Sequence, residues 1–486
     1  MTSLDPRPPY SAAELATLYP PQLRLQLVQV LLRHGERTPV TARFANAGLP
    51  AFWPYCSAAR QLRATVLVPS ESDKPSSLST LEWRRRLETF ARADGSPVAA
   101  KGPDGEVDAL CDMGMLTDRG RLSTLRLGQR LRNLYVNQLG FLPASLDDTS
   151  LVYLRSTPVP RALESLQQAF VGLYPRVSSP PVIVTRVAAD ETLFPNDGNC
   201  RRLAALSRAF AERAAQRWNG SEEMAYLTKK LGRWMPEDSP KVAVDSRPRL
   251  SGIMDSINAS RAHGPRTRLP PAFYDPEVKR IMEKIGVDEW YAGYKESREY
   301  RTLGIGSLVA DVVTRMVDSA ASASPLRLAL SGCHDTTLAA TLSSLGAFDT
   351  EEWPPFTSSV AIELFRHADK PAPSPSSSSS SSSSSWLPSW LSAQSDATLG
   401  RKPTPLLTDA DRRKLDGYYV RIRYNDKPVT IPGCRAPGKH LEGDASFCTL
   451  EAFKAIVDDF TPRDWKQECR NVKADPFPPK PEPAGF

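Results

Sequence analysis

The sequence predicts an α/β fold: a three-layer sandwich with a mainly parallel central sheet and a helical cap lobe. Three short apolar runs, at 23–32, 151–154 and 326–330, end abruptly in polar residues. Helix-forming segments follow the second and third runs, and the long stretch 188–325 is mainly helical. Strands that alternate with helices are typical of a parallel sheet covered by helices. The stretch 188–325 is therefore expected to form a lobe over that sheet.

Size and charge set limits on the function. The chain has 486 residues, 41% of them apolar, which is enough for one elaborated domain or two domains. The net charge is +7 and the pI is about 9.0, which favours acidic partners. Lys and Arg are spread along the chain without long blocks. We therefore expect a local anion pocket and no nucleic-acid surface.

The chain divides into segments of different composition. The expected parts, in order, are an irregular N-terminal segment (1–22), an α/β core (23–187 and 326–473) interrupted by the helical cap (188–325), a disordered Ser/Pro-rich insertion (371–402) and a proline-rich tail (474–486) that does not pack. The insertion contains ten consecutive serines and cannot bury apolar surface. Its Trp-Leu-Pro-Ser-Trp-Leu segment at 386–391 is interpreted as a chance aromatic pair, with a small partner or membrane hook as the alternative.

Periodicity places the individual elements. Apolar residues at helical spacing, such as Leu127, Leu131 and Leu134, predict amphipathic helices, and Pro160 is suited to a first helical turn. Helices are expected at 117–135, 160–173, 201–218, 222–234, 300–320 and 336–345, and strands at 23–32, 151–154, 182–185, 326–330, 359–365 and 418–424. Residues 41–110 are interpreted as an irregular insertion that builds one wall of the site, with helix-forming composition at 81–91.

Cysteines and the N-terminus bear on location. Seven cysteines fit no zinc pattern and, with no apolar leader in residues 1–22, are expected to be free thiols in a reducing compartment; a Cys434–Cys448 bridge is the alternative. An intracellular, cytoplasmic location follows, with the mitochondrion as the alternative. The sequence contains no run of 18 apolar residues, so no transmembrane segment is predicted. The five histidines are too scattered to suggest a metal site.

Polar residues end three of the predicted strands. These ends are Arg33-His34-Gly35, Arg155-Ser156-Thr157 and His334-Asp335. Each motif alone is weak, and a surface arginine beside a strand-end histidine is the plain alternative for the first. Parallel strands bring their carboxyl ends to one edge of a sheet. The three ends together therefore predict one shared pocket.

The residue types in that pocket suit phosphate chemistry. Phosphoryl transfer needs fixed positive charge on the phosphoryl oxygens and an attacking atom in line with the leaving oxygen. Arginine supplies the first and a neutral imidazole the second. The candidates are His34 as nucleophile, Asp335 as general acid, and Arg33, Arg37, Arg155 and His334 as phosphate ligands. Nearby arginines would lower the pKa of Asp335, which predicts better activity at acidic pH. Glu36 is expected to face solvent.

The motifs also carry a resemblance to a known family. The pattern Arg33-His34-Gly35-x-Arg37-x-Pro39 with a later His334-Asp335 resembles the histidine acid phosphatase branch of the phosphoglycerate-mutase-like superfamily, and most closely the lysophosphatidic acid phosphatase type 6 group. The similarity extends through 116–120, 127–132, 155–157 with Arg161, 172–175, 345–349 and 353–356. The resemblance implies a phosphohistidine intermediate, no metal cofactor and the fold predicted above. Ser123 departs from the family pattern, which often has glutamine there.

Substrate and rival functions stay open at this level. A phosphoglycerate-mutase-type phosphotransferase lacks the His-Asp ending, and a phosphate-binding scaffold without turnover is a third class. The expected partner is a small phosphomonoester, with a lipid phosphate at a membrane surface as one candidate. The resemblance suggests lysophosphatidic acid-type substrates, and the basic chain also suits inositol phosphates, as in a phytase-like enzyme.

Overall fold

The computed structural model describes residues 8–69, 77–91, 94–322, 324–371, 399–471 and 475–486. Its centre is a nine-stranded mixed sheet in the order β12-β13-β10-β9-β1-β8-β6-β7, with β11 beside β10. The strands are β1 (Leu23–Arg33), β6 (Val152–Ser156), β7 (Ile183–Val184), β8 (Leu328–Cys333), β9 (Ser359–His367), β10 (Tyr418–Tyr424), β11 (Lys427–Val429), β12 (His440–Leu441) and β13 (Asp444–Thr449). Strands β1, β8, β6 and β7 are mutually parallel, whereas β9 runs antiparallel to both β1 and β10.

Strand β1 lies between two hydrophobic cores. Its side chains alternate, so Leu27 and Leu31 join one core while Val28, Val30 and Leu32 join the other. A strand buried on both faces has a nearly continuous apolar sequence, as 23–32 does. This position explains why the sequence predicts the strand so well.

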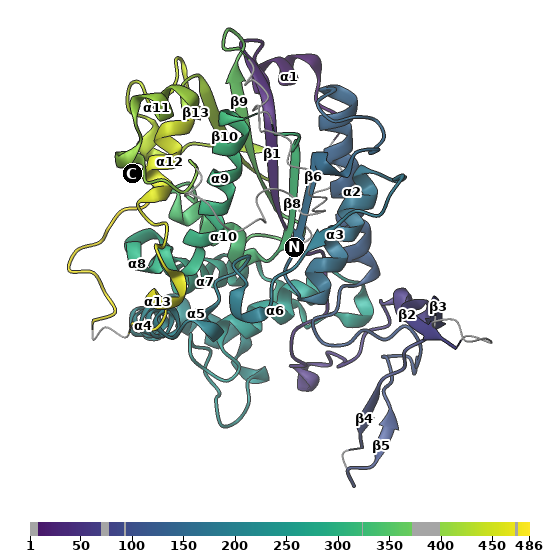
Figure 1. The fold of residues 1–486 in the computed structure, drawn as a ribbon. Coiled ribbons are helices and arrows are strands. Elements are labelled where there is room, and N and C mark those ends of the chain that lie inside the picture. Colours follow the sequence, from purple (N-terminus) through teal and green to yellow (C-terminus); the bar gives the residue numbers. More distant parts are fainter. Residues whose placement is uncertain (1–7, 70–76, 92–93, 323, 372–398, 472–474) are drawn as a thin grey trace.

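Helices cover both faces of the sheet, which confirms the predicted α/β class (Figure 1). One face packs against α2 (Asp118–Leu131) and α3 (Pro160–Leu173). The opposite face packs against α9 (Ser307–Ala321), α10 (Asp335–Ser344) and α12 (Leu450–Asp458). Two shorter helices, α11 (Asp409–Leu415) and α13 (Trp465–Glu468), complete the C-terminal part.

The region 188–325 is largely helical. It contains α4 (Arg201–Trp218), α5 (Glu222–Leu231), α6 (Leu250–Arg261), α7 (Pro276–Glu296) and α8 (Arg298–Arg301), besides α9. Helix α4 has the predicted bounds, but α6 and α7 were not predicted. Buried residues of α7 occupy adjacent positions such as 281–283 and 285–287, so the helix has no clear polar face that would reveal its period.

Several expectations for the chain's irregular parts are wrong. Residues 81–91 form no helix: β2 (Leu62–Val68) pairs with β3 (Ser77–Trp83), and β4 (Glu88–Phe90) with β5 (Pro97–Ala99), because cross-strand pairing overrides local helix composition. Both hairpins project from the body of the molecule (Figure 1). The N-terminal segment contains α1 (Ala12–Leu18), which begins with a capping box of Ser11 and Glu14.

The proline-rich tail also packs, contrary to expectation. The Phe477 ring lies 5.0 Å from that of Phe210, and the Glu482 amide donates to the Glu296 carbonyl at 2.8 Å. The predicted disorder of the Ser/Pro-rich insertion concerns mainly residues 372–398, including the Trp-Leu segment at 386–391, which lie outside the described residues.

Six cysteines are paired, so the prediction of free thiols is wrong for them. The disulfides are Cys56–Cys111, Cys200–Cys469 and Cys434–Cys448. The remaining cysteine, Cys333, is a buried free thiol on β8. Sequence spacing gave no signal for two of the three bonds because they join residues 55 and 269 positions apart.

Candidate active site

The three polar strand ends lie side by side at one edge of the sheet. In the register of the parallel strands, Arg33 on β1 lies beside Cys333 on β8, and Ser156 on β6 lies beside Gly332. The His34 amide donates to the Cys333 carbonyl at 3.1 Å. As a result the imidazole rings of His34 and His334 meet edge to face, with centroids 5.5 Å apart.

Two glycines allow the loop after β1 to pack against helix α2. A Cβ on Gly35 would lie 2.3 Å from the Gly120 carbonyl oxygen, and a Cβ on Gly120 would lie 2.2 Å from that of Glu36. Neither position can hold a side chain without moving the backbone. The Gly35 amide donates to Ser165 on α3 at 3.0 Å, so both helices of this face hold the loop that carries His34.

His34 is buried and held in one tautomer. Its Nδ1 lies 2.9 Å from the Gly35 carbonyl oxygen. Because a carbonyl only accepts, Nδ1 carries the proton and Nε2 keeps its lone pair. Burial, followed by the charges of Arg161, Arg33 and Arg37, holds the pKa of His34 well below 6.5. The imidazole is therefore neutral in mildly acidic as well as neutral solution.

Three arginines lie near enough for their charges to act on this imidazole. Arg33 and Arg37 were predicted, and Arg161, at the start of α3, was not. The Phe356 ring supports two of them, with the Arg33 guanidinium 4.3 Å and the Arg37 guanidinium 5.6 Å from its centroid. The Nε atoms of all three arginines are buried and have no hydrogen-bond partner among the described residues. These donors are available to an anion.

Asp335 lies beside one of these arginines. Its Oδ2 accepts hydrogen bonds from the Arg33 guanidinium at 2.7 Å and from the Trp353 indole at 3.0 Å. Burial alone would raise the pKa of Asp335, but Arg33 and then Trp353 outweigh it, so the pKa lies below its ordinary value. In the free protein this carboxyl is ionised at neutral pH.

His334 and Thr157 connect the second and third strand ends. The Nε2 of His334 lies 3.2 Å from the Thr157 hydroxyl. Burial, followed by the charge of Arg161, lowers the pKa of His334 below its ordinary value. The His334 ring beside His34 is therefore neutral at neutral pH.

The expected phosphate ligand Arg155 has a different environment. Its guanidinium donates to Glu191 at 2.6 Å, both side chains being fully buried, and also contacts Thr192 and Asp311. None of its described contacts is with His34, Arg33, Arg37, His334 or Asp335. We therefore correct the expectation for Arg155: it forms a buried ion pair, and Arg161 provides the third guanidinium beside the imidazole.

The segment 353–357 also borders the site. Besides Trp353 and Phe356, the Pro354 carbonyl accepts a hydrogen bond from Arg33, and the Thr357 amide donates to the His34 carbonyl at 3.1 Å. Thr357 has a φ of 63°, which is strained for a β-branched residue and is typical of functional sites. The motif at 353–356 was recognised only as part of the family resemblance, with no role attached.

Glu36 does not face solvent, contrary to expectation. Its side chain is fully buried and accepts a hydrogen bond from Ser123, whose hydroxyl also lies 2.8 Å from that of Thr357. Burial raises the pKa of Glu36, while the hydrogen bond from Ser123 lowers it. Ser123, the residue that departs from the family pattern, therefore joins α2 to the site loop.

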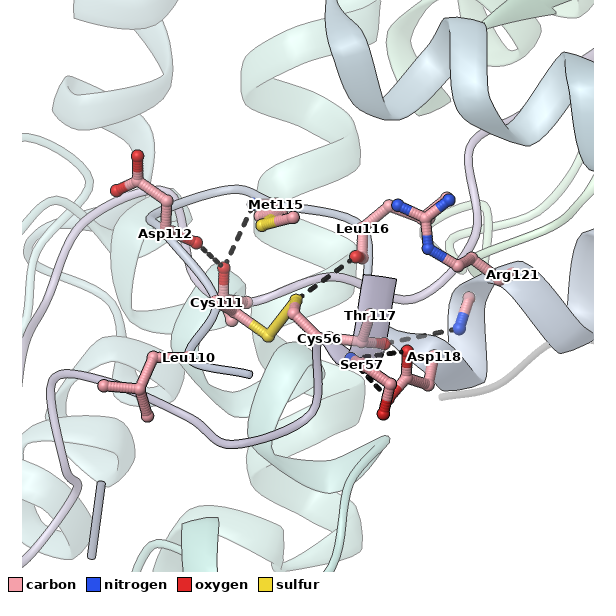
Figure 2. The surroundings of a disulfide bond; sticks show 12 residues. Cys56, Ser57, Leu110, Cys111, Asp112, Met115, Leu116, Thr117, Asp118 and Arg121 are labelled. Atoms are coloured by element: carbon pink, nitrogen blue, oxygen red, sulfur yellow. Dashed lines mark hydrogen bonds between the residues drawn. A yellow bond between two sulfur atoms is a disulfide. The ribbon is translucent and has the colours of Figure 1, made fainter. Parts of the chain in front are cut away.

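The loop that follows Arg37 is fixed from two directions. Asp255 on α6 accepts from Arg37 at 2.7 Å and from the Val40 amide at 2.9 Å. On the other side, the disulfide Cys56–Cys111 lies beside Leu116 and Asp118, as Figure 2 shows. Leu116 forms a β-bridge with Arg37. Helix α6 and the segment that contains Cys56, Cys111 and Leu116 thus both help to place this arginine.

The fold and the site define an α/β protein with a buried histidine and several arginines at one edge of its sheet, and comparison with known proteins specifies the family. Residues 24–425 match the model of the histidine phosphatase superfamily (branch 2), and the chain belongs to this family. It is 39% identical to a probable acid phosphatase of Schizosaccharomyces pombe over 94% of this chain and 96% of that one. The human lysophosphatidic acid phosphatase type 6 is 26% identical over 71% of this chain and 75% of its own.

A solved structure shows the same fold. The phytase of Klebsiella sp. ASR1 aligns with a TM-score of 0.51 and 16% identity over 95% of this chain and 99% of its own. The predicted class, a histidine acid phosphatase, is confirmed by the family and by these relatives. Within the described ranges, side chains of His, Cys, Asp and Glu form no group of three arranged to hold a metal ion, and no helix is long and apolar enough to cross a membrane.

Proposed function

We propose that this phosphatase hydrolyses phosphomonoesters through a phosphohistidine on His34. The observation that carries the proposal is the neutral imidazole whose Nε2 lone pair is free while Nδ1 is tied to Gly35, in a ring of arginines. Nε2 attacks phosphorus, and a bond from nitrogen to phosphorus replaces the bond to the ester oxygen. Water then attacks the phosphohistidine and releases inorganic phosphate.

The phosphate oxygens are bound by Arg33, Arg37, Arg161 and His334 in this proposal. The buried, unpartnered Nε groups of the three arginines support it, because a phosphate would supply the acceptors that these donors lack. Arg161 also lies in the first turn of α3, where helix amides and the helix dipole favour an anion. Arg155 is left out because its described contacts are with Glu191, Thr192 and Asp311, and none is with another residue of this group.

Asp335 acts as the general acid. It donates its proton to the departing alkoxide, and the resulting carboxylate accepts a proton from the water that attacks the phosphohistidine. The ion pair with Arg33 opposes protonation, but a phosphate dianion that takes over Arg33 would relieve this effect. Catalysis by these residues requires no metal or organic cofactor.

Substrate identity is proposed at the level of class. A lysophosphatidic acid-type lipid is the first candidate, since the human relative is named for that activity. An inositol phosphate is the second, since the related structure is a phytase. A phosphate-release screen of lipid, inositol and sugar phosphates separates the two. We further propose that residues 188–325 act as a cap, because α6 brings Asp255 to Arg37.

The compartment is also a proposal. An intracellular, cytoplasmic location was expected, but three disulfides favour a compartment that is oxidising enough to keep them. Fractionation of cells that express the tagged chain, together with peptide mapping of the unreduced protein, tests this point.

The central test compares wild type with His34→Ala. We expect wild type to release nitrophenol from p-nitrophenyl phosphate and His34→Ala to lose at least about 10³-fold in turnover. Acid-quenched wild type should carry phosphate on a His34 peptide by mass spectrometry. Equal rates in the two proteins would reject the nucleophile, and binding of phosphate without any turnover would favour the scaffold alternative.

A further inference from the structure

Trp353 contacts the proposed general acid directly. Its indole Nε1 donates to Asp335 Oδ2 at 3.0 Å, on the same oxygen that the Arg33 guanidinium binds at 2.7 Å. The other oxygen, Oδ1, accepts from the Thr336 amide at 2.9 Å. Three donors from three separate segments of the chain therefore meet at this carboxyl, and the indole is the one neutral side chain among them.

Trp353 itself is rigidly placed. It is 9% exposed, its ring packs at 5.1 Å against Tyr291 and at 6.0 Å, edge to face, against Trp290, both on α7. The next residue, Pro354, supplies a carbonyl to Arg33. The indole N–H thus points at a fixed place next to the Arg33–Asp335 pair.

We propose that Trp353 is the positioning residue of the general acid: its indole holds Asp335 in the orientation from which the carboxyl protonates the leaving oxygen. The proposal rests on the proposed function. Without the indole, Arg33 and the Thr336 amide are the remaining described donors to this carboxyl. The side chain can then turn, so that it no longer faces the leaving oxygen of the substrate.

The indole also affects protonation. A hydrogen bond to the ionised form favours that form, so its removal raises the pKa of Asp335. The charged and titratable groups that act on Asp335 from the surrounding elements are Arg33 on β1, Arg37 in the following loop, Arg161 on α3, His334 beside it, Cys333 on β8 and Tyr291 on α7. All of them stay in place when only Trp353 changes.

Trp353→Phe keeps an aromatic ring and removes the donor. On an alkyl phosphate, whose leaving group needs a proton, we expect turnover to fall about tenfold, and on p-nitrophenyl phosphate to fall less than about twofold. In the plot of alkyl phosphate turnover against pH, the fall in rate on the basic side should move to a pH about one unit higher. Trp290→Phe is the matched control: it changes a tryptophan that packs on Trp353 and has no described contact with Asp335, so both rates should stay within about twofold of wild type.

A double-variant cycle separates this role from a loss of folding. In an Asp335→Asn background, adding Trp353→Phe should leave the ratio of alkyl to nitrophenyl turnover unchanged, because the acid is already absent. Equal losses on both substrates in Trp353→Phe, or a fall in rate on the basic side that stays at the same pH, would overturn the inference while the phosphatase function stands. If wild type shows no activity that depends on His34, both proposals are rejected.

Discussion

The guanidinium of Arg33 lies 2.7 Å from the carboxylate of Asp335, although 302 positions of sequence separate the two residues. The pair joins a predicted phosphate ligand to the predicted acid. Without substrate it lowers the pKa of Asp335. In the proposed mechanism, phosphate bound to Arg33 frees the carboxyl to carry a proton, so that substrate binding and protonation of the acid are linked through this arginine.

This link predicts how activity depends on pH. The pKa of Asp335 is lowered, so its protonated fraction rises as pH falls, while His34, whose pKa is also lowered, stays neutral in mild acid. The ratio of kcat/KM for an alkyl phosphate to that for p-nitrophenyl phosphate should therefore increase as pH decreases, since only the alkyl leaving group needs the proton. Because both substrates are phosphate monoesters, the effect of their own ionisation largely cancels in this ratio.

Asp335→Asn should remove this dependence. We expect it to lose about 10²-fold or more on alkyl phosphates and much less on p-nitrophenyl phosphate, leaving a ratio that no longer varies with pH. Steady-state kinetics between pH 4 and 7 provide the measurement. Equal losses on both esters would show that Asp335 is not the acid.

Arg161 and Arg155 are six positions apart and should respond differently to alanine. Arg161→Ala removes charge beside the reacting phosphorus, so turnover should fall about 10²-fold or more while stability changes little. Arg155→Ala leaves Glu191 buried without its partner, which costs about 3–5 kcal/mol of folding free energy. The Arg155→Ala protein that remains folded should turn over within a few-fold of wild type. Steady-state kinetics and urea unfolding of both variants test this difference. A severe loss of turnover in an Arg155→Ala protein of wild-type stability would contradict the structural role of Arg155.

The contrast between these arginines shows how far sequence reasoning reaches. Strand β6 and helix α3 were predicted, and so was the edge of the sheet at which they meet. Which way a side chain points from the last residues of a strand depends on sheet register and on the neighbouring helix, and Arg155 points to Glu191 and Asp311. The position of Arg161 in the first turn of a helix that follows a strand end was the available signal, because such turns bind anions.

Other site features depend on tertiary contacts that local sequence does not encode. Glu36 is polar and follows a glycine, which suggests a surface position, yet the close approach of Gly35 to Gly120 buries it. Trp353 lies in a proline-rich segment that has no periodicity, so nothing in its surroundings indicates a contact with Asp335. The positions of residues that directly follow a predicted strand, such as His34 and His334, could be predicted. The positions of residues in connecting segments, such as Trp353, could not.

The disulfides can be ranked by the chain length that they close. Cys200–Cys469 spans 269 positions and Cys434–Cys448 spans 14. The chain-entropy model gives about 5–6 kcal/mol for the first and about 3 kcal/mol for the second. Replacing both cysteines of a pair by serine should therefore lower the free energy of unfolding more for the first pair, measured by urea denaturation without reductant. Cys333→Ala, which changes the free thiol, is the control for a buried substitution. Equal stability with and without reductant would show that the bonds do not form.

A buried carboxylate away from the site predicts how stability responds to acid. Glu363 on β9 accepts from Arg421 at 2.7 Å and from Arg423 at 3.1 Å. Burial alone would raise the pKa of Glu363, but these two arginines lower it from 4.5 to about 2. Because the folded pKa lies below the unfolded one, this carboxylate stabilises the fold above pH 4.5, by an amount on the order of 3 kcal/mol that is lost as pH falls from about 4.5 to about 2.

Glu363→Gln tests this prediction. The variant should be less stable at pH 7, because Arg421 and Arg423 lose the carboxylate that they share. Its unfolding free energy should also vary less with pH below 4.5 than that of wild type. Unfolding by guanidinium chloride at pH 7, 4.5 and 3 gives the comparison. The matched control is Glu82→Gln, because the ion pair of Glu82 with Arg63 is exposed. The prediction fails if wild type and Glu363→Gln lose the same free energy between pH 4.5 and 3, since another carboxylate would then control acid unfolding.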